Sequence, residues 1–213
     1  MPISTIIGGV LAGVPFALAL ACGAWIIALV VGMGVTGLSV SRYRALRMIG
    51  DIYYMSTRGM PELVLLFLIY FGLGTSVGLN SYSAGIIALG LAQSPFAAEY
   101  LRAALKTVGV GQREARQSVG LSNTAVRLHI IGPQAARFAI TPMLNVFIGL
   151  LKFSSLASAI GWREIIARQQ ELISRGIGDL VYLHVTVATC IVYVVTVLPI
   201  SLVVDSYTKR LVK

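Results

Sequence analysis

The chain has 213 residues, of which 57% are hydrophobic and only 12% charged, and its mean hydropathy is +0.85. Soluble domains have about 25% charged residues, so this composition excludes an ordinary water-soluble protein. The formal net charge of +9 is compatible with nucleic-acid binding, but the cations stand at the ends of apolar segments, where a membrane accounts for them. We expect one multi-pass membrane domain over residues 1–213 and no nucleic-acid partner.

Apolar segments that can cross a bilayer follow one another along the chain. No charge occurs between Met1 and Ser41 or between Leu63 and Ala98. Either run exceeds the ~20 residues that span ~30 Å of hydrocarbon. The first run lacks the basic start of a signal peptide, so we expect it to be retained. The sequence predicts five spans, at about 6–38, 45–71, 84–105, 138–160 and 180–204.

Three residues inside these spans carry local predictions. Pro95 removes a backbone donor, so it is expected to kink the third span or to end one half of it. Cys22 and Cys190 show no metal-ligand or redox spacing. We expect both cysteines to be small buried hydrophobic residues.

The distribution of lysine and arginine predicts the orientation. Loops on one side of the membrane are rich in these cations, whereas on the other side 72–83 has no charge and 161–179 balances its arginines with acids. Cytoplasmic loops carry the excess of positive charge. The N-terminus is therefore expected outside and the C-terminus in the cytoplasm. The cations on the expected cytoplasmic side are Arg42, Arg44, Arg47, Lys106, Arg113, Arg116, Arg127, Lys209, Arg210 and Lys213.

The long basic loop, about 107–136, contains an ordered motif. It resembles the EAA loop of ABC importer permeases, whose pattern is Glu-Ala-Ala, three residues, Gly, nine residues, Ile, any residue, Leu-Pro. Arg116 replaces the second alanine and Gly132 replaces the leucine. The resemblance implies a knob that docks on a separate ATPase. The matching residues are Glu114, Ala115, Gly120, Ile130 and Pro133.

Further stretches resemble polar-amino-acid permeases in the same order along the chain. Arg58–Gly72 is similar to their Arg-Gly-Thr-Pro segment, and Leu151–Leu156 is similar to their Leu-Lys-Asp-Thr-Ser-Leu stretch. Glu62, after the proline, is typical of subunits for histidine, lysine, arginine or opine uptake. Phe153 replaces the usual acidic residue, so the resemblance implies that a non-identical second permease carries the complete site.

The resemblance implies a fold, partners and a location. The fold is expected to be all-α, with five transmembrane helices of the type I, MetI-like importer permease fold, in the bacterial inner membrane. The expected partners are ABC ATPase subunits, a second permease, a substrate-binding protein and a polar, basic amino acid or derivative. The chain has no Gly-rich phosphate loop with Lys-Ser/Thr. ATP and Mg²⁺ are therefore expected on the ATPase, and this chain is expected to have no cofactor, metal or catalytic residue.

Polar groups beside the apolar runs are candidates for a substrate pathway. A charge at the bilayer centre costs about 2.5–3.5 kcal/mol, so it normally faces a partner or water. Glu62 is expected to take the substrate amine and Arg58 or Lys152 its carboxylate, unless these groups simply pair with each other. The favoured interpretation of Glu99 is an ion pair with Arg102, three residues on. The candidate set is Arg58, Glu62, Ser94, Glu99, Lys152, Ser154 and Ser155.

An intramembrane enzyme, such as a serine protease using a serine with His184, is the alternative function. It needs a nucleophile within reach of its base, and no Gly-x-Ser-x-Gly elbow is present. His184 is more simply a hydrogen-bonded packing residue, and His129 is expected to be exposed. The segment Trp162–Gly176 is typical of an amphipathic helix on the outer surface. There it closes the outer gate, meets a binding protein or only lies on the membrane.

Overall fold

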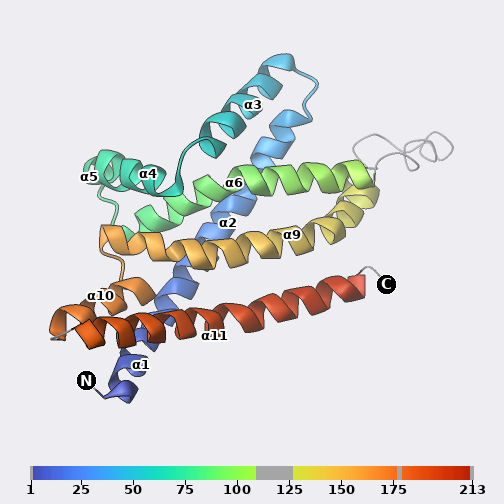
Figure 1. Ribbon diagram of the computed structural model, residues 1–213. Helices are drawn as coiled ribbons and strands as arrows, with labels where there is room; N and C mark the ends of the chain where they lie inside the picture. The colour runs from blue at the N-terminus through green and yellow to red at the C-terminus, as the bar shows by residue number, and fades with distance from the viewer. Residues whose placement is uncertain (1, 109–126, 177–178, 212–213) are drawn as a thin grey trace.

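Helices form all the regular structure in the computed structural model, which describes residues 2–108, 127–176 and 179–211. In Figure 1, α6, α9 and α11 lie side by side and α2 crosses behind them. The α-helices are α1 (Ile3–Leu11), α2 (Val14–Ser39), α3 (Arg44–Arg58), α4 (Glu62–Phe67), α5 (Thr75–Val77), α6 (Ser81–Thr107), α9 (Gly132–Phe153), α10 (Ile165–Arg175) and α11 (Asp179–Leu211). Short π- or 3-10-helical segments are η1 (Leu68–Gly74), η2 (Arg127–Ile131) and η3 (Ser154–Ile160).

Length and composition allow three described helical segments to cross a membrane, namely Ile3–Ser39, His129–Ile160 and Leu180–Lys209. Arg44–Arg58 and Glu62–Val77 qualify together as a fourth, although they are bent by 103° at the break between them. These segments correspond to four of the five predicted spans. The remaining prediction, 84–105, lies within α6, whose 27 residues reach about 40 Å. Gln93, Ser94 and Glu99 lower the hydropathy of α6 below that of the other spans.

Small residues let α2 and α6 approach closely. A Cβ atom on Gly90 would lie 2.6 Å from the Cβ of Ile27 and 2.8 Å from the carbonyl oxygen of Ala24. Further along the same contact, a Cβ on Gly32 would lie 2.8 Å from the Cβ of Ala97. Helices in lipid associate by such close backbone packing, because the lipid tails supply no hydrophobic force between them. Gly32 therefore lets α2 approach α6 closely, whereas no atom would lie within 4 Å of a Cβ on Gly8, Gly34 or Gly37.

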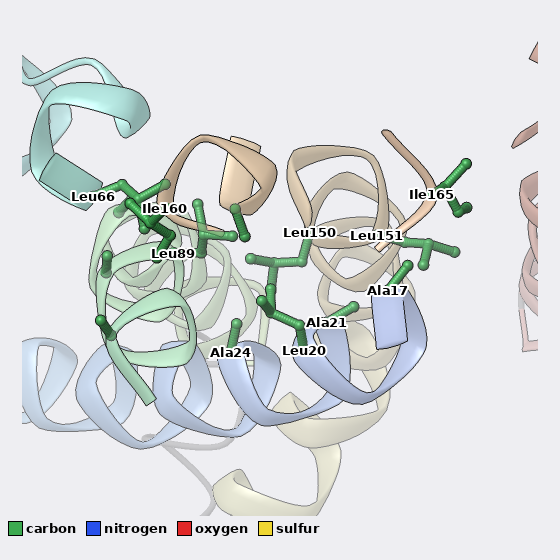
Figure 2. Packing of buried hydrophobic residues seen from close by; sticks show 14 of the residues in the cluster. Ala17, Leu20, Ala21, Ala24, Leu66, Leu89, Leu150, Leu151, Ile160 and Ile165 are labelled. Atoms are coloured by element: carbon green, nitrogen blue, oxygen red, sulfur yellow. The ribbon is translucent and has the colours of Figure 1, made fainter. Parts of the chain in front are cut away.

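The core lies where α4 and η3 cover the helices α2, α6 and α9. Figure 2 shows Leu20 of α2, Leu66 of α4, Leu89 of α6 and Leu150 of α9 directed into it, and all four side chains are fully buried. The opposite faces of the outer helices stay apolar and exposed. On α11 they include Ile191, Val195 and Leu202. This distribution suits a protein whose surroundings are hydrocarbon rather than water.

Pro95 does not end the third predicted span, because α6 continues through it. Proline cannot donate to the carbonyl four residues earlier, which belongs to Leu91. The Ser94 hydroxyl donates to that Leu91 carbonyl at 2.8 Å and so replaces the missing amide. The prediction for the cysteines was wrong: Cys22 and Cys190 are both exposed on the bundle, since their sides of α2 and α11 face away from the core.

The amphipathic helix expected at Trp162–Gly176 is present as α10. The Trp162 ring stacks on Tyr82 with 4.6 Å between ring centroids, and its Nε1 donates to the Phe16 carbonyl at 3.2 Å. These contacts fix the start of the segment to α2 and α6. In Figure 1, α10 lies at the end of the bundle that holds the N-terminus, and α11 ends at the opposite end.

Candidate functional site

A cluster of charged and aromatic side chains occupies the contact between α3, α4 and α6. We call it the α3–α6 cluster. The Glu99 carboxylate accepts from the Arg58 guanidinium at 2.9 Å and from the Tyr54 hydroxyl at 2.8 Å. Arg58 also donates to the Tyr54 hydroxyl and lies over the Phe96 ring. The members of the cluster are Tyr53, Tyr54, Arg58, Glu62, Gln93, Ser94, Phe96, Glu99 and Arg102.

The break between α3 and α4 positions the charges of this cluster. Arg58 is the last residue of α3, and Glu62 is the first residue of α4. A cation at a helix C-terminus and an acid at an N-terminus both interact favourably with the helix dipole. Gly59 ends α3 and Pro61 precedes α4. The bend between these helices brings the side chains of Arg58 and Glu62 to α6. The side chains of Arg58 and Glu99 are each 47% exposed, which leaves them open to a ligand.

The predicted ion pair between Glu99 and Arg102 was wrong. Arg102 lies over the Tyr54 ring, 4.7 Å from its centroid, and donates to the Ser39 hydroxyl at 3.2 Å. Spacing along α6 permits the predicted pair. Side chains from α3 reach Glu99 instead, so the partner is chosen by tertiary packing and not by helix periodicity.

Two polar side chains nearer the middle of α6, Gln93 and Ser94, bond to residues of α4 and α3. Gln93 Nε2 donates to Glu62 at 3.5 Å, and the hydroxyls of Tyr53 and Ser94 lie 2.7 Å apart. Tyr53, Tyr54 and Gln93 were not predicted as site residues from the sequence. The two tyrosines could have been predicted, because Tyr53 and Tyr54 lie within two turns of Arg58 on an amphipathic helix.

Lys152 lies in a different place, a groove between α9 and α11. The groove has a volume of about 490 Å³ and is lined by Lys152, Ser155, Ile166, Tyr193, Val194, Val197, Leu198 and Ser201. Within the described parts of the chain, no hydrogen bond or ion pair joins Lys152 to Arg58, Glu62 or Glu99. Ser154 is fully buried and donates to the Leu151 carbonyl. The structure therefore divides the predicted pathway residues into two groups and places Ser154 in the core.

The predicted coupling motif is only partly described. Glu114, Ala115 and Gly120 lie outside the described residues. Ile130 belongs to η2, and Pro133 lies in the first turn of α9. Proline is well placed there, because the first amides of a helix have no partner within it. The end of α6 and the start of α9, which flank the loop, lie at the same end of the bundle as the end of α11 (Figure 1).

The structure gives no support to the alternative of an intramembrane serine protease. His184 lines an apolar cavity of about 320 Å³ between α1 and α11. No described serine hydrogen-bonds to it, and the described residues contain no group of three metal-ligating side chains. His129 is exposed, as expected, and makes interactions of its own.

An all-helical bundle with membrane-length helices and apolar outer faces defines a multi-pass membrane protein. Residues 26–213 match the family of binding-protein-dependent transport system inner membrane components, and the chain belongs to that family. It is a permease component of an ABC transporter in the inner membrane, and ATP is bound by a partner ATPase rather than by this chain.

Relatives and solved structures agree with this assignment. The probable glutamine ABC transporter permease protein GlnM of Bacillus subtilis (strain 168) is 34% identical, over 86% of this chain and 84% of the relative. The nopaline transport system permease protein NocQ of Agrobacterium fabrum is 36% identical over 60% of each chain. A solved amino acid ABC transporter with histidines is similar with a TM-score of 0.86 and 26% identity, over 99% of both chains. The MetNI methionine transporter, at 19% identity and a TM-score of 0.71 over 92% of this chain and 94% of that one, shares the fold.

Proposed function

We propose that this chain forms half of the translocation pathway of an importer for polar amino acids, with preference for basic amino acids or their derivatives. The observation that carries the proposal is the half-exposed α3–α6 cluster inside an otherwise apolar bundle. Such charges in a membrane protein mark a substrate route by default. The printed names of similar proteins, which include glutamine and nopaline permeases and an amino acid transporter with histidines, support an amino acid as the ligand.

The charges of the cluster suit a zwitterion. Arg58 pairs with the Glu99 carboxylate, whereas Arg102 lies over the Tyr54 ring and has no ion pair among the described residues. One cation is therefore left to bind the substrate carboxylate, and guanidinium groups bind carboxylates in a bidentate manner. Among the residues that the structure describes, Glu62 is held only by a 3.5 Å contact from Gln93, so its carboxylate is available to the substrate amine. Phe153 leaves α9 without the usual acid, and a non-identical second permease supplies it.

We further propose how the chain is oriented in the membrane and how it is assembled with its partners. The N-terminus lies outside and the C-terminus in the cytoplasm, with five crossings that include α6. The loop at about 107–136, through Glu114, Ala115, Gly120, Ile130 and Pro133, docks on the ATPase. A substrate-binding protein delivers the amino acid from outside, and Lys152 and Ser155 bind polar groups in the α9–α11 groove.

Uptake into proteoliposomes tests this function. The chain is reconstituted with its ATPase, its second permease and its binding protein, and ATP-driven uptake of radiolabelled arginine, histidine and glutamine is compared. We expect uptake of arginine and histidine, each competing with the other. Uptake of glutamine alone would contradict the preference for basic substrates, and uptake of no amino acid at all would refute the proposal.

Glu99→Gln is expected to reduce arginine uptake while leaving the fold intact. The amide keeps the shape but loses the charge that holds Arg58, and a charge-assisted hydrogen bond is worth about 1.5–3 kcal/mol, equivalent to roughly tenfold or more in rate. Because the pair is half exposed, stability should change by less than about 1 kcal/mol. Initial uptake rate and thermal unfolding midpoint are measured on the same preparation.

Asp51→Asn is the matched control for this substitution. Asp51 is an exposed acid on α3 and has no ion pair among the described residues. The control should keep the wild-type uptake rate. Equal rates for Glu99→Gln and wild type would remove Glu99 from the pathway.

A further inference from the structure

Glu164 is a fully buried acid that none of the functions above uses. It stands between η3 and α10, and its side chain caps α10. Its Oε2 accepts from the Ile166 amide at 2.9 Å, and its Oε1 accepts from the Ala167 amide at 3.0 Å. Acids are almost never fully buried unless they are paired, so this one requires an explanation.

The third bond to Glu164 comes from another helix. The Tyr193 hydroxyl of α11 donates to Glu164 Oε2 at 3.1 Å. Tyr193 also lines the α9–α11 groove, beside Lys152 and Ser155. The outer helix α10 is thus tied to a transmembrane helix through one carboxylate, and the tie ends at a groove that a ligand can reach.

No cation neutralises Glu164 among the described residues. On α10, Arg168 bonds to Glu171 at 3.0 Å, and Arg175 also pairs with Glu171. The elements α1 and α2 carry no charged residue, and η3 carries none either. On α9 and α11, Lys152 and Tyr193 line the same groove, and Arg163, which precedes Glu164 in the chain, is exposed and forms no ion pair with it.

Close packing surrounds the Glu164 carboxylate, which is fully buried. A Cβ atom on Gly13, at the start of α2, would lie 2.6 Å from the backbone nitrogen of Ile165. The backbone at the start of α2 therefore packs against the first residue of α10, Ile165, which is itself fully buried. The carboxylate can gain water only if α10 moves away from α2 and α11.

We propose that Glu164 and Tyr193 form a latch that holds the outer helix α10 against α11 when the carboxyl group is protonated and releases it when the group is charged. In the neutral state, Glu164 can donate its proton to the Tyr193 oxygen while its other oxygen accepts from a helix amide. In the charged state, the closed latch keeps a carboxylate away from water, and opening hydrates it. The latch does not depend on the proposed substrate, so it can be tested without any substrate.

The titration of Glu164 falls at neutral pH. Burial raises the pKa of Glu164 from 4.5 to about 7, although the Ile166 and Ala167 amides and the Tyr193 hydroxyl each lower it. An acid whose pKa is higher in the closed state stabilises that state below its ordinary pKa, and this stabilisation is lost as the pH rises through the closed-state value. With a pKa of 4.5 in the open state and of about 7 in the closed state, the ratio of closed to open latches should fall roughly tenfold between about pH 6 and pH 8.

Amide hydrogen exchange in the assembled transporter, held in lipid nanodiscs, tests the latch. Protection of the first turn of α10, corrected for intrinsic base catalysis, should fall about tenfold from pH 6 to pH 8. The Ser83 amide serves as internal reference, because Asn80, which does not titrate, caps it at 2.8 Å. Glu164→Gln is neutral at every pH, so its α10 should stay protected throughout. Tyr193→Phe removes the bond that ties α10 to α11, so its α10 should be less protected at every pH, and because this bond also lowers the pKa of Glu164, its transition should move to higher pH.

Glu171→Gln is the matched control, an acid-to-amide change on the exposed face of the same helix, and it should keep the wild-type transition. A flat wild-type profile would overturn the latch, as would a transition that persists unchanged in Glu164→Gln. If Glu164→Gln does not assemble, the direction of the shift in Tyr193→Phe decides: a shift to lower pH, or none, refutes the proposal. None of these results depends on which substrate is transported.

Discussion

Replacing Gly32 with valine should deplete folded protein in the membrane severalfold. A Cβ atom at this position would lie 2.8 Å from the Cβ of Ala97 and 3.1 Å from the backbone nitrogen of Ala98. Neither atom can rotate away, so α2 and α6 must separate along the contact that builds the core. Overpacking costs about 1–3 kcal/mol and sometimes more, and valine adds two further methyl groups at the closest approach. The yield of monodisperse protein and its thermal unfolding midpoint measure the effect.

Gly34→Val is the matched control for this prediction. It makes the same change two residues further along α2, where no atom lies within 4 Å of the added Cβ. Both variants lose the same glycine flexibility and gain the same β-branched side chain. We expect the control to fold like the wild type. Equal loss in both variants would show that valine acts through helix propensity and that the α2–α6 contact is not responsible.

Reversing the charge of Glu114 should abolish ATP-driven uptake. This prediction rests on the proposed coupling role of the EAA-like loop, in which Glu114 and Gly120 present a rigid knob to the ATPase. A cation in place of the acid introduces a like-charge or unpaired group at an interface, where truncation of one buried charged partner costs about 2–5 kcal/mol. Glu114→Lys should therefore lose most of the co-purified ATPase, and uptake should fall to background.

Gln112→Lys adds a cation two residues earlier, outside the motif, and should keep the ATPase. The purified permease should have the same unfolding midpoint in both variants, which separates lost docking from lost folding. If Glu114→Lys retains the ATPase and the uptake of the wild type, the loop has another role. Crosslinks that place this loop on the outer side of the membrane would refute both the docking and the predicted orientation.

The sequence predicted a large part of the candidate site. Arg58, Glu62, Ser94 and Glu99 were recognised because ionisable and hydroxyl groups beside long apolar runs are costly in lipid and so are rarely incidental. The structure places all four in the α3–α6 cluster. Tyr53, Tyr54 and Gln93 were missed, since aromatic and amide residues on an amphipathic helix have no comparable cost.

The errors share a physical origin. The pair Glu99–Arg102 was inferred from spacing on one helix, but Tyr54 and Arg58 arrive from α3 and occupy the carboxylate. Ser154 and Ser155 are neighbours, yet one is buried in the core and the other lines the α9–α11 groove. Helix rotation decides between such neighbours, and hydropathy alone does not specify it.

By itself, the sequence determined that this is a membrane protein, which family it belongs to, and approximately where most of its candidate spans lie. Hydropathy, charge placement and ordered motifs are local properties of a chain. The tertiary structure alone decided which charges meet, which predicted residues face a groove, and that Glu164 is buried against Tyr193. These outcomes depend on the 103° bend after α3 and on the close approach of α2 to its neighbours. Contacts between distant segments follow from helix packing, which no local pattern encodes.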